Sequence, residues 1–238
     1  MKSRHHLGPS LRILVTALTL TVLAGCSGGS GEPQADSSAL LTAARASLDG
    51  TSSVHFSLTS TNVPTDGTRL VSGQGVVARP NAFQGELGVL LNGSKVSIDL
   101  VSAGGTVYAQ LPFSTGFQVV DPATFGLSDP ANLIDSSTGI TRMFGELTGI
   151  TDKGQQRVGD DVVTELDGSL PGALVKDLLT SADPAQPVQA QLYITTSGRQ
   201  LRRAVLTGPF FAKDQASTFD ILLDKYGAPV TITAPKTS

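Results

Sequence analysis

Acidic side chains at three nearby positions are the first candidates for chemistry. Asp160, Asp161 and Glu165 bring three carboxylates into a short stretch, and carboxylate oxygens are good ligands for Ca²⁺ and Mg²⁺. Their spacing does not match an EF-hand loop, and Gly159 ahead of the acidic pair favours a hairpin turn. We therefore expect no metal site here.

Glutamates could also supply the two carboxylates of a glycosidase. The candidates Glu86, Glu146 and Glu165 are scattered through different segments, and the chain has no tryptophan to stack on a sugar ring. We expect these glutamates to face solvent.

His55 is the one histidine beyond the N-terminal 25 residues, so a Ser–His pair or a histidine metal site would depend on it. It falls on the polar side of an alternating run, two residues before Ser57, which predicts a surface position.

Arg202 and Arg203 could hold a lipid phosphate, but only one of two neighbours on a strand faces inward, and a solvated position at the sheet edge explains the two arginines equally well. Without a catalytic set or a cofactor motif, we expect a protein that is not an enzyme.

The charge balance argues against a nucleic-acid-binding protein. The chain has 17 Lys and Arg and 20 Asp and Glu residues; loss of Lys2, Arg4 and Arg12 with an export signal would leave fourteen basic residues and a net charge of −6. Such a chain has no basic footprint for nucleic acid. One cysteine also excludes a disulfide framework and a multi-cysteine zinc site.

That cysteine, Cys26, follows an N-terminal export signal. Basic residues precede the apolar run from Ile13 to Val22, which is too short for a spanning helix and is typical of a signal peptide. Leu23-Ala24-Gly25-Cys26 resembles the bacterial lipobox. The resemblance implies cleavage before Cys26 and attachment of diacylglycerol and further acyl chains such as palmitate. A secreted protein with a chance cysteine is the alternative.

These features predict three parts of the chain. Residues 1–25 form the signal peptide, 26–35 a lipidated flexible tether rich in Gly and Ser, and 36–238 the folded domain. The eight residues Ser27–Gln34 of the tether span roughly 16 Å. We therefore expect the domain to stay close to the cell membrane, lipid-anchored on the extracytoplasmic side.

Helical patterns occur at the start and in the middle of the folded domain. Asp36–Asp49 combines a capping aspartate with an apolar stripe and ends at Gly50. Asp121-Pro122 and Asp129-Pro130 each provide a cap followed by proline, and helical spacing continues to a stop near Gly149. A short helix also fits Leu170–Leu179.

Alternating apolar and polar residues predict about eleven strands in two meanders, and Asn92-Gly93 is a strong hairpin signal. The fold class is therefore α+β, with one large curved antiparallel sheet. The strands are expected at 54–59, 71–78, 83–91, 95–101, 106–111, 155–158, 162–166, 188–196, 201–207, 217–223 and 229–233.

A large sheet covered by few helices can leave an apolar cavity on its concave face, although the same residues could form a filled core. Gly85 interrupts one aliphatic row, which predicts a hole beside its neighbours Phe83 and Leu87. The candidate ligand-binding residues are Phe83, Gly85, Leu87, Val89, Leu91, Val96, Ile98, Leu100, Val107 and Leu133.

Several segments together resemble a known family. Val107-Tyr108-Ala109-Gln110-Leu111-Pro112-Phe113, the two Asp-Pro-Ala turns at 121 and 129, Leu201-Arg202-Arg203-Ala204 and the closing segment from Lys225 to Ile232 are similar to the mycobacterial LppX/LprA/LprF/LprG lipoproteins. The likeness runs from the lipobox to the C-terminus.

The resemblance implies a half-barrel sheet with helices on its concave face, enclosing a cavity for multi-acyl lipids. It also implies trafficking of membrane lipids or acylated glycolipids across the cell envelope, with an envelope lipid transporter as a candidate partner. The alternative function is a lipid-anchored interaction protein with a filled core, partnering an envelope sensor or transporter.

Overall fold

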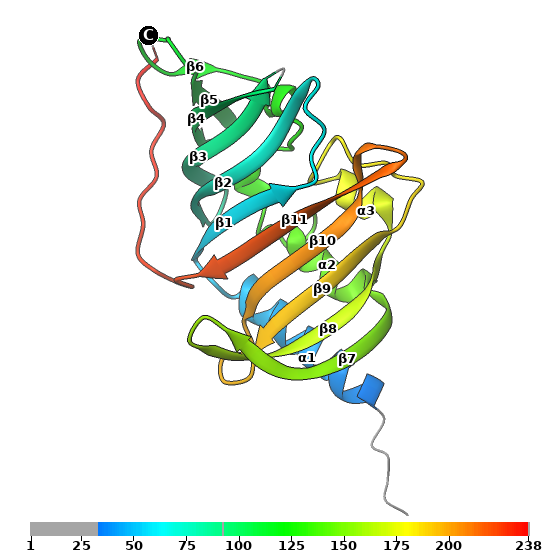
Figure 1. Ribbon diagram of the computed structural model, residues 1–238. Helices are drawn as coiled ribbons and strands as arrows, with labels where there is room; N and C mark the ends of the chain where they lie inside the picture. The colour runs from blue at the N-terminus through cyan, green and yellow to red at the C-terminus, as the bar shows by residue number, and fades with distance from the viewer. Residues whose placement is uncertain (1–32, 92, 238) are drawn as a thin grey trace, which may run out of the picture. The chain divides into compact units, whose positions relative to one another are not determined.

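The structure, a computed structural model, describes residues 33–91 and 93–237 (Figure 1). The chain divides into two compact units, residues 1–30 and residues 31–238, and the second unit is described below. The predicted signal peptide, Cys26 and most of the predicted tether lie outside the described residues. The hydrophobic core runs from Leu40 to Leu223, so a chain that begins at Ser27 retains all of it.

Eleven strands form one antiparallel sheet in the order β6-β5-β4-β3-β2-β1-β11-β10-β9-β8-β7. Their bounds are β1 Ser53–Thr61, β2 Thr68–Ala78, β3 Ala82–Leu91, β4 Ser94–Ala103, β5 Thr106–Gln110, β6 Gln118–Val119, β7 Thr148–Val158, β8 Asp161–Leu170, β9 Val188–Thr195, β10 Leu201–Ala212 and β11 Gln215–Asp224.

The sheet consists of two meanders that meet at its centre. β1 pairs with β11, so that Phe56 lies opposite Leu223 and Leu58 opposite Ile221. The edges are β6 and β7, and the sheet is not closed into a barrel. This arrangement confirms the predicted α+β class with one curved antiparallel sheet.

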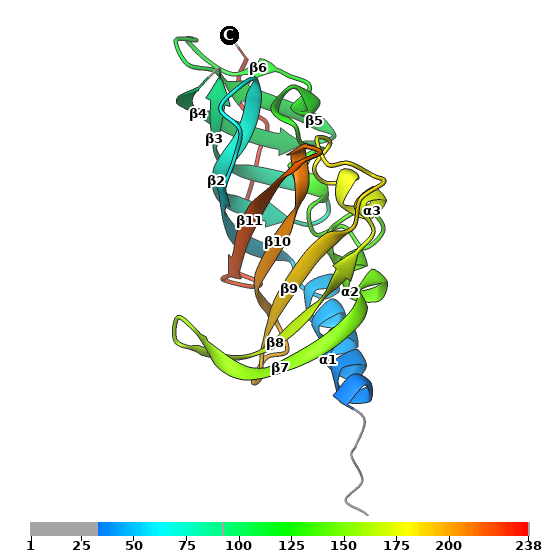
Figure 2. The same ribbon diagram turned by 45° about the vertical axis from the view of Figure 1, so that its right-hand side comes forward.

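The helices lie on one face of the sheet (Figure 2). They are α1 (Pro33–Asp49), α2 (Met143–Glu146) and α3 (Gly172–Lys176), together with the short 3₁₀ helices η1 (Pro122–Phe125), η2 (Pro130–Asn132) and η3 (Ile140–Arg142). The predicted central helix beyond Gly139 is shorter than expected, because β7 already begins at Thr148. We refer to residues 121–146 and 171–186 as the helical layer.

The apolar stripe of α1 explains its position. Leu40, Leu41, Ala44 and Leu48 are all buried, which confirms the predicted inward face. The helix begins at Pro33, three residues before the expected cap, and the amide of Gly50 closes its last turn on the carbonyl of Ala46 at 3.0 Å.

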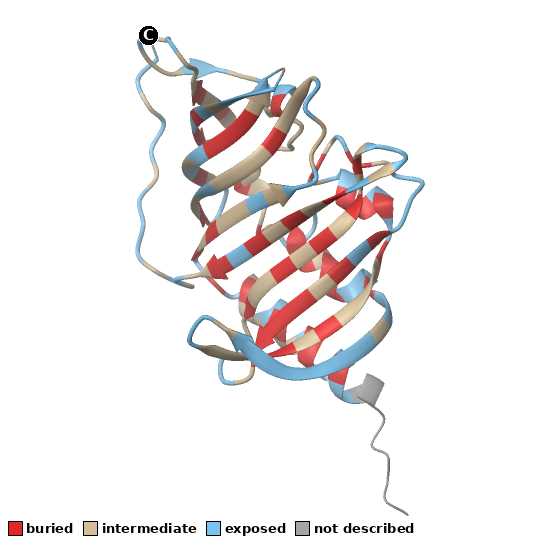
Figure 3. Cartoon of the chain, viewed as in Figure 1, coloured by how far each residue is buried: buried red, intermediate tan, exposed pale blue. Residues whose placement is uncertain are grey.

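Two predicted strand assignments differ from the structure. Residues 229–233 alternate in polarity but form no strand; the segment after β11 runs alongside the sheet to β6, where Thr237 bridges Phe117 (Figure 1). The eleventh strand is instead the two-residue β6. β7 is longer than predicted, and its polar residues lie exposed along the edge (Figure 3). A polar edge strand without alternation gives no periodic signal.

Candidate functional site

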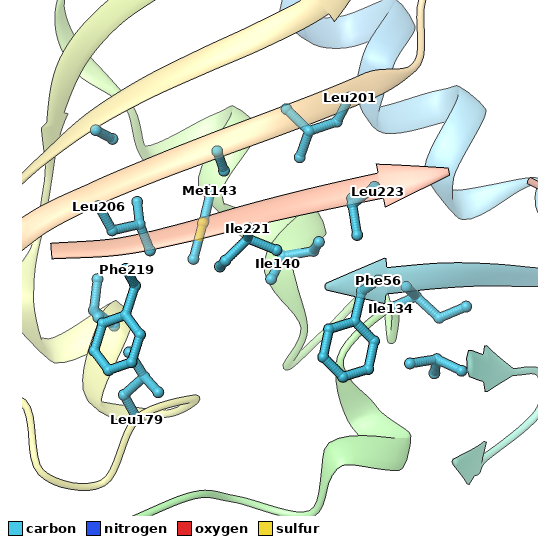
Figure 4. Close-up of a cluster of buried hydrophobic side chains, with 14 of the residues drawn as sticks. Phe56, Ile134, Ile140, Met143, Leu179, Leu201, Leu206, Phe219, Ile221 and Leu223 are labelled. Atoms are coloured by element: carbon cyan, nitrogen blue, oxygen red, sulfur yellow. The ribbon is translucent and has the colours of Figure 1, made fainter. Parts of the chain in front are cut away.

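An apolar cavity of about 80 Å³ lies between the central strands and the helical layer. Phe56, Leu206 and Ile221 on the sheet side face Ile140 and Met143 on the helical side (Figure 4). The remaining lining residues are Leu58, Leu70, Gly73 and Leu87 from strands and Leu127, Ser128, Asp129, Pro130, Leu133, Val175, Leu178 and Leu179 from the helical layer.

The strand side of the wall follows from alternation and from one glycine. Phe56 and Leu58 share one face of β1, and Leu206 and Ile221 project from β10 and β11 on the other side of the β1–β11 pairing. Gly73 contributes no side chain; a Cβ at this position would lie 3.1 Å from Leu87 and 3.6 Å from the Phe56 ring. These two side chains therefore fill the space beside Gly73.

Aspartate caps shape the helical side of the wall. The Asp121 and Asp129 carboxylates each accept a hydrogen bond of 2.9 Å, from the amides of Ala123 and Ala131, and a proline begins each short helix. Both predicted caps are thereby confirmed. They direct Phe125 and Ala131 into the core.

The two parts of the helical layer are joined beside the cavity by a small set of bonds that we call the clasp. The amide of Ser128 donates to the carbonyl of Leu178 at 3.2 Å, and the amide of Thr180 donates to the carbonyl of Gly126 at 3.1 Å. The Ser128 hydroxyl donates to the Asp177 carbonyl, and the Asp177 carboxylate pairs with Arg142 at 2.7 Å. The Arg142 side chain is 35% exposed and the Asp177 side chain 53% exposed, so the ion pair is partly solvated.

A second, tighter structure holds residues 132–139. The Asp135 carboxylate accepts hydrogen bonds from the hydroxyl of Ser137 at 2.6 Å, its amide at 2.8 Å, and the amide and hydroxyl of Thr138 at 2.9 and 3.0 Å. The hydroxyl and amide of Ser137 contribute most to lowering the pKa of Asp135 to about 2. A Cβ at Gly139 would lie 2.5–2.7 Å from three carbonyl oxygens, so only glycine fits this approach.

Arg79 holds the segment 132–139 in place at Ile134. Its guanidinium donates to the carbonyls of Leu48, Thr51 and Ile134, at 3.2, 3.0 and 2.6 Å. One side chain therefore ties the end of α1, the start of β1 and the helical layer together. The clasp end of the layer has no comparable bridge to the sheet among the described residues.

Only some of the ten predicted ligand-binding residues lie on the cavity wall. Leu87 and Leu133 lie on the cavity wall. Phe83, Val89, Ile98, Leu100 and Val107 are buried in the adjoining core, Val96 is partly buried, and Leu91 is 39% exposed at the end of β3.

The hole expected beside Gly85 is absent. Gly85 pairs directly with Gly75 of β2, and a Cβ at Gly85 would lie 2.8 Å from the Gly75 Cα and 2.9 Å from the Phe83 ring. The space is filled by the backbone of the neighbouring strand and by that ring. Gly85 therefore serves close strand approach, which corrects the cavity argument made for it.

Most of the cavity wall was not among the predicted residues. Phe56, Leu58, Leu206 and Ile221 were assigned to strands from their alternation, but nothing local indicated that β1 and β11 would be neighbours. Ile140 and Met143 lay in the predicted helical interruption, where their spacing gave the only available signal.

The polar candidates occupy other surroundings. His55 Nδ1 lies 2.7 Å from the Asp224 carboxylate, Arg202 pairs with Asp161, and Arg203 pairs with Asp220. Both arginines are thus already paired. Glu165 accepts a hydrogen bond from the Tyr193 hydroxyl at 3.2 Å, and burial is the largest cause that raises the pKa of Tyr193. Among residues 33–91 and 93–237, no cluster of three His, Cys, Asp or Glu side chains could hold a metal ion.

No helix in the described part of the chain is long and apolar enough to cross a bilayer.

Comparison with known proteins identifies relatives of this fold. The lipoarabinomannan carrier proteins LprG of Mycobacterium bovis and Mycobacterium tuberculosis are 26% identical over 240 residues, covering 99% of this chain and 98% of theirs. The crystal structure of LprF from Mycobacterium bovis matches with a TM-score of 0.68 at 22% identity, covering 85% of this chain and 98% of LprF. LppX of Mycobacterium tuberculosis matches with a TM-score of 0.61 at 18% identity, covering 84% and 99%.

The family model described as LppX_LprAFG lipoprotein matches residues 36–232. This match covers most of the chain, including the cavity wall, the clasp and both meanders. The protein therefore belongs to the LppX/LprA/LprF/LprG family of lipoproteins.

Proposed function

We propose that this lipoprotein binds multi-acyl lipids or acylated glycolipids in the cavity between its sheet and helical layer and carries them through the cell envelope. The apolar cavity is the observation that carries the proposal, because a water-poor space lined by aliphatic side chains favours acyl chains. The relatives named lipoarabinomannan carriers support acylated glycolipids as the ligand class. The role needs no catalysis.

The volume of the cavity requires a conformational change. At about 80 Å³ it is much smaller than the roughly 300–1,000 Å³ of a typical ligand pocket. A lipid with two or more acyl chains enters only if the walls separate. The structure therefore represents the closed form of the proposed carrier.

The helical layer is the wall that moves in this proposal. Each cavity-lining strand is hydrogen-bonded to neighbours on both sides, so displacing one would break a ladder. The clasp consists of three hydrogen bonds and one solvated ion pair. Separating the clasp costs fewer bonds than opening the sheet.

On opening, the cavity would extend along the sheet from Leu87. The apolar core continues from that position, and we propose that its residues line the enlarged space: Phe83, Val89, Ile98, Leu100 and Val107.

Anchoring through Cys26 on the extracytoplasmic side would place the carrier beside its lipid source. An envelope lipid transporter is the proposed supplier or acceptor.

Native mass spectrometry of a chain that begins at Ser27, and so lacks the lipidated cysteine, tests the function. We expect the folded protein to retain a lipid with at least two acyl chains. Leu133→Trp places an indole ring in the cavity and should remove most of this lipid. Ile150→Trp is the matched control, because Ile150 packs against the core away from the cavity wall.

Two outcomes would refute the proposal. A folded wild-type protein that binds no lipid after incubation with acylated glycolipid would favour the interaction protein with a filled core. Equal lipid retention by the folded Leu133→Trp and Ile150→Trp variants would place the ligand elsewhere.

A further inference from the structure

The loop between β5 and β6, residues 111–117, exposes an aromatic side chain completely. The relative exposure of Phe113 is 106%, and Val119, next to the loop on β6, is 64% exposed. These are the two most exposed large apolar side chains among the described residues. A single exposed apolar residue is common, so exposure alone implies no function.

The backbone at Phe113 gives a second, independent observation. The Ser114 amide donates to the Leu111 carbonyl at 3.0 Å, closing a turn with Pro112 and Phe113 in its middle. Phe113 has φ of +68°, the left-handed conformation that this turn position normally assigns to glycine. The phenylalanine thus strains the turn while its ring makes no contact with the core. Neither folding nor packing explains a phenylalanine here.

The loop between β5 and β6 lies in an uncharged stretch of the chain. Residues 100–120 contain no charged side chain, whereas the mature chain carries a net charge of −6. Lys236 precedes Thr237, which bridges Phe117, and Lys95 lies near the start of β4, at the sheet end where β5 enters the loop. Neither lysine pairs with a carboxylate in the described part of the chain. Two exposed carboxylates also border the loop, Asp99 opposite Gln110 and Asp121 just after β6, so these four side chains carry no net charge. An uncharged apolar tip suits insertion into a lipid surface.

The loop also lies far from the point where the tether joins the folded unit. The loop and β6 lie at one end of the unit, and the start of α1 lies at the other (Figures 1 and 2). The tether enters at the start of α1, so an anchored chain can present the loop to a second lipid surface. We propose that Phe113 and Val119 insert into a lipid surface and dock the protein there. This inference does not depend on whether the cavity binds lipid.

The absence of tryptophan from the chain makes insertion directly measurable. In a chain that begins at Ser27, Phe113→Trp introduces a single tryptophan at the tip. With vesicles of phosphatidylglycerol and phosphatidylcholine, we expect its emission to shift to shorter wavelength and to be quenched by brominated acyl chains. Leu222→Trp, at an exposed site on β11, is the matched control and should show neither change.

Phe113→Gly separates docking from folding. Glycine relieves the strained turn, so this variant should melt at a higher temperature than the wild type. It should also bind the anionic vesicles about tenfold more weakly, since a buried phenylalanine side chain is lost from the interface. Vesicle binding equal to that of the wild type would overturn the proposal. It would be overturned equally if the emission of the Phe113→Trp variant were unchanged by the vesicles and shifted only with an envelope protein.

Discussion

Gly85 of β3 lies directly opposite Gly75 of β2, and a Cβ on Gly85 would stand only 2.8 Å from the Gly75 Cα. The same Cβ would also meet the Gln74 carbonyl oxygen and the Phe83 ring. No residue other than glycine can occupy position 85 without displacing β2 or Phe83. The pair of glycines therefore sets the distance between two strands that continue to the cavity wall at Gly73 and Leu87.

We predict that Gly85→Ala destabilises the fold by roughly 1–3 kcal/mol, the usual cost of overpacking. Urea unfolding measures the change. Gly145→Ala is the control, because a Cβ there meets only the end of Arg45 at 3.6 Å and alanine favours a helix. It should unfold at equal or higher urea concentration. A Gly85→Ala variant as stable as the wild type would mean that β2 and β3 separate easily.

The Gly75–Gly85 pair illustrates the limits of sequence-based prediction. Alternation correctly placed Gly85 on the inner face of a strand, but the register that sets it against a second glycine is a property of two strands. The cavity shows the same limit over a longer distance. Phe56 and Ile221 are separated by most of the chain, and only the pairing of β1 with β11 brings them together.

Local signals predicted local structure well. The Asp121 and Asp129 caps, the buried stripe of α1 and nearly all strands followed from residue type and spacing, because their causes lie within a few residues. Residues 229–233 had the alternation of a strand but pair with no other strand. The strand that precedes them, β11, is already hydrogen-bonded to β1 on one side and to β10 on the other, so it has no free edge to offer. The predicted wall at 83–107 followed the most aliphatic stretch, whereas the cavity lies where the helical layer leaves space.

Asp135 should make stability depend on pH in the acidic range. Its pKa of about 2 in the folded state is below the unfolded value near 3.9, so the carboxylate stabilises the fold above about pH 4. This contribution is lost as the pH falls through about 2. We predict that Asp135→Asn is less stable than the wild type at pH 7 and that the difference shrinks between pH 4 and 2.

Urea unfolding of both proteins across this range measures the effect, and carbon NMR of the Asp135 carboxyl group reports its pKa. Ser137→Ala removes the hydroxyl that contributes most to the shift and should raise that pKa. A constant stability difference from pH 7 to pH 2 would show that the hydrogen bonds around Asp135 do not favour its charged form.

Cys26 is predicted to be the covalent membrane anchor. It is the only cysteine in the chain and ends the lipobox-like segment Leu23-Ala24-Gly25. Full-length wild-type protein should partition into the detergent phase on phase separation, and Cys26→Ala should move to the aqueous phase, because two or three acyl chains anchor stably. Unchanged partition of the variant would contradict lipidation at this residue. The Phe113→Gly variant should still partition with detergent, since anchoring and surface docking use different groups.

The clasp should open more readily than the tight segment around Asp135. Hydrogen exchange reports opening at the amides of Ser128 and Thr180, which cross between the two parts of the helical layer. These amides should exchange faster than the amide of Ile140, which is bonded to the Leu133 carbonyl within the closely packed turn at Gly139. Bound lipid should change exchange at the clasp and leave the sheet amides of β3 unaffected.

A charge variant tests whether the clasp controls this opening. Arg142→Gln removes the ion pair with Asp177, and such a solvated pair contributes at most about 1 kcal/mol, or roughly fivefold in the opening equilibrium. We expect exchange at Ser128 and Thr180 to accelerate within that limit, and lipid uptake to accelerate with it. Arg45→Gln is the control, because it removes a similarly solvated pair with Asp49 on α1, away from the cavity. If Arg142→Gln, like the control, left hydrogen exchange and lipid uptake unchanged, the helical layer would have to open at a place other than the clasp.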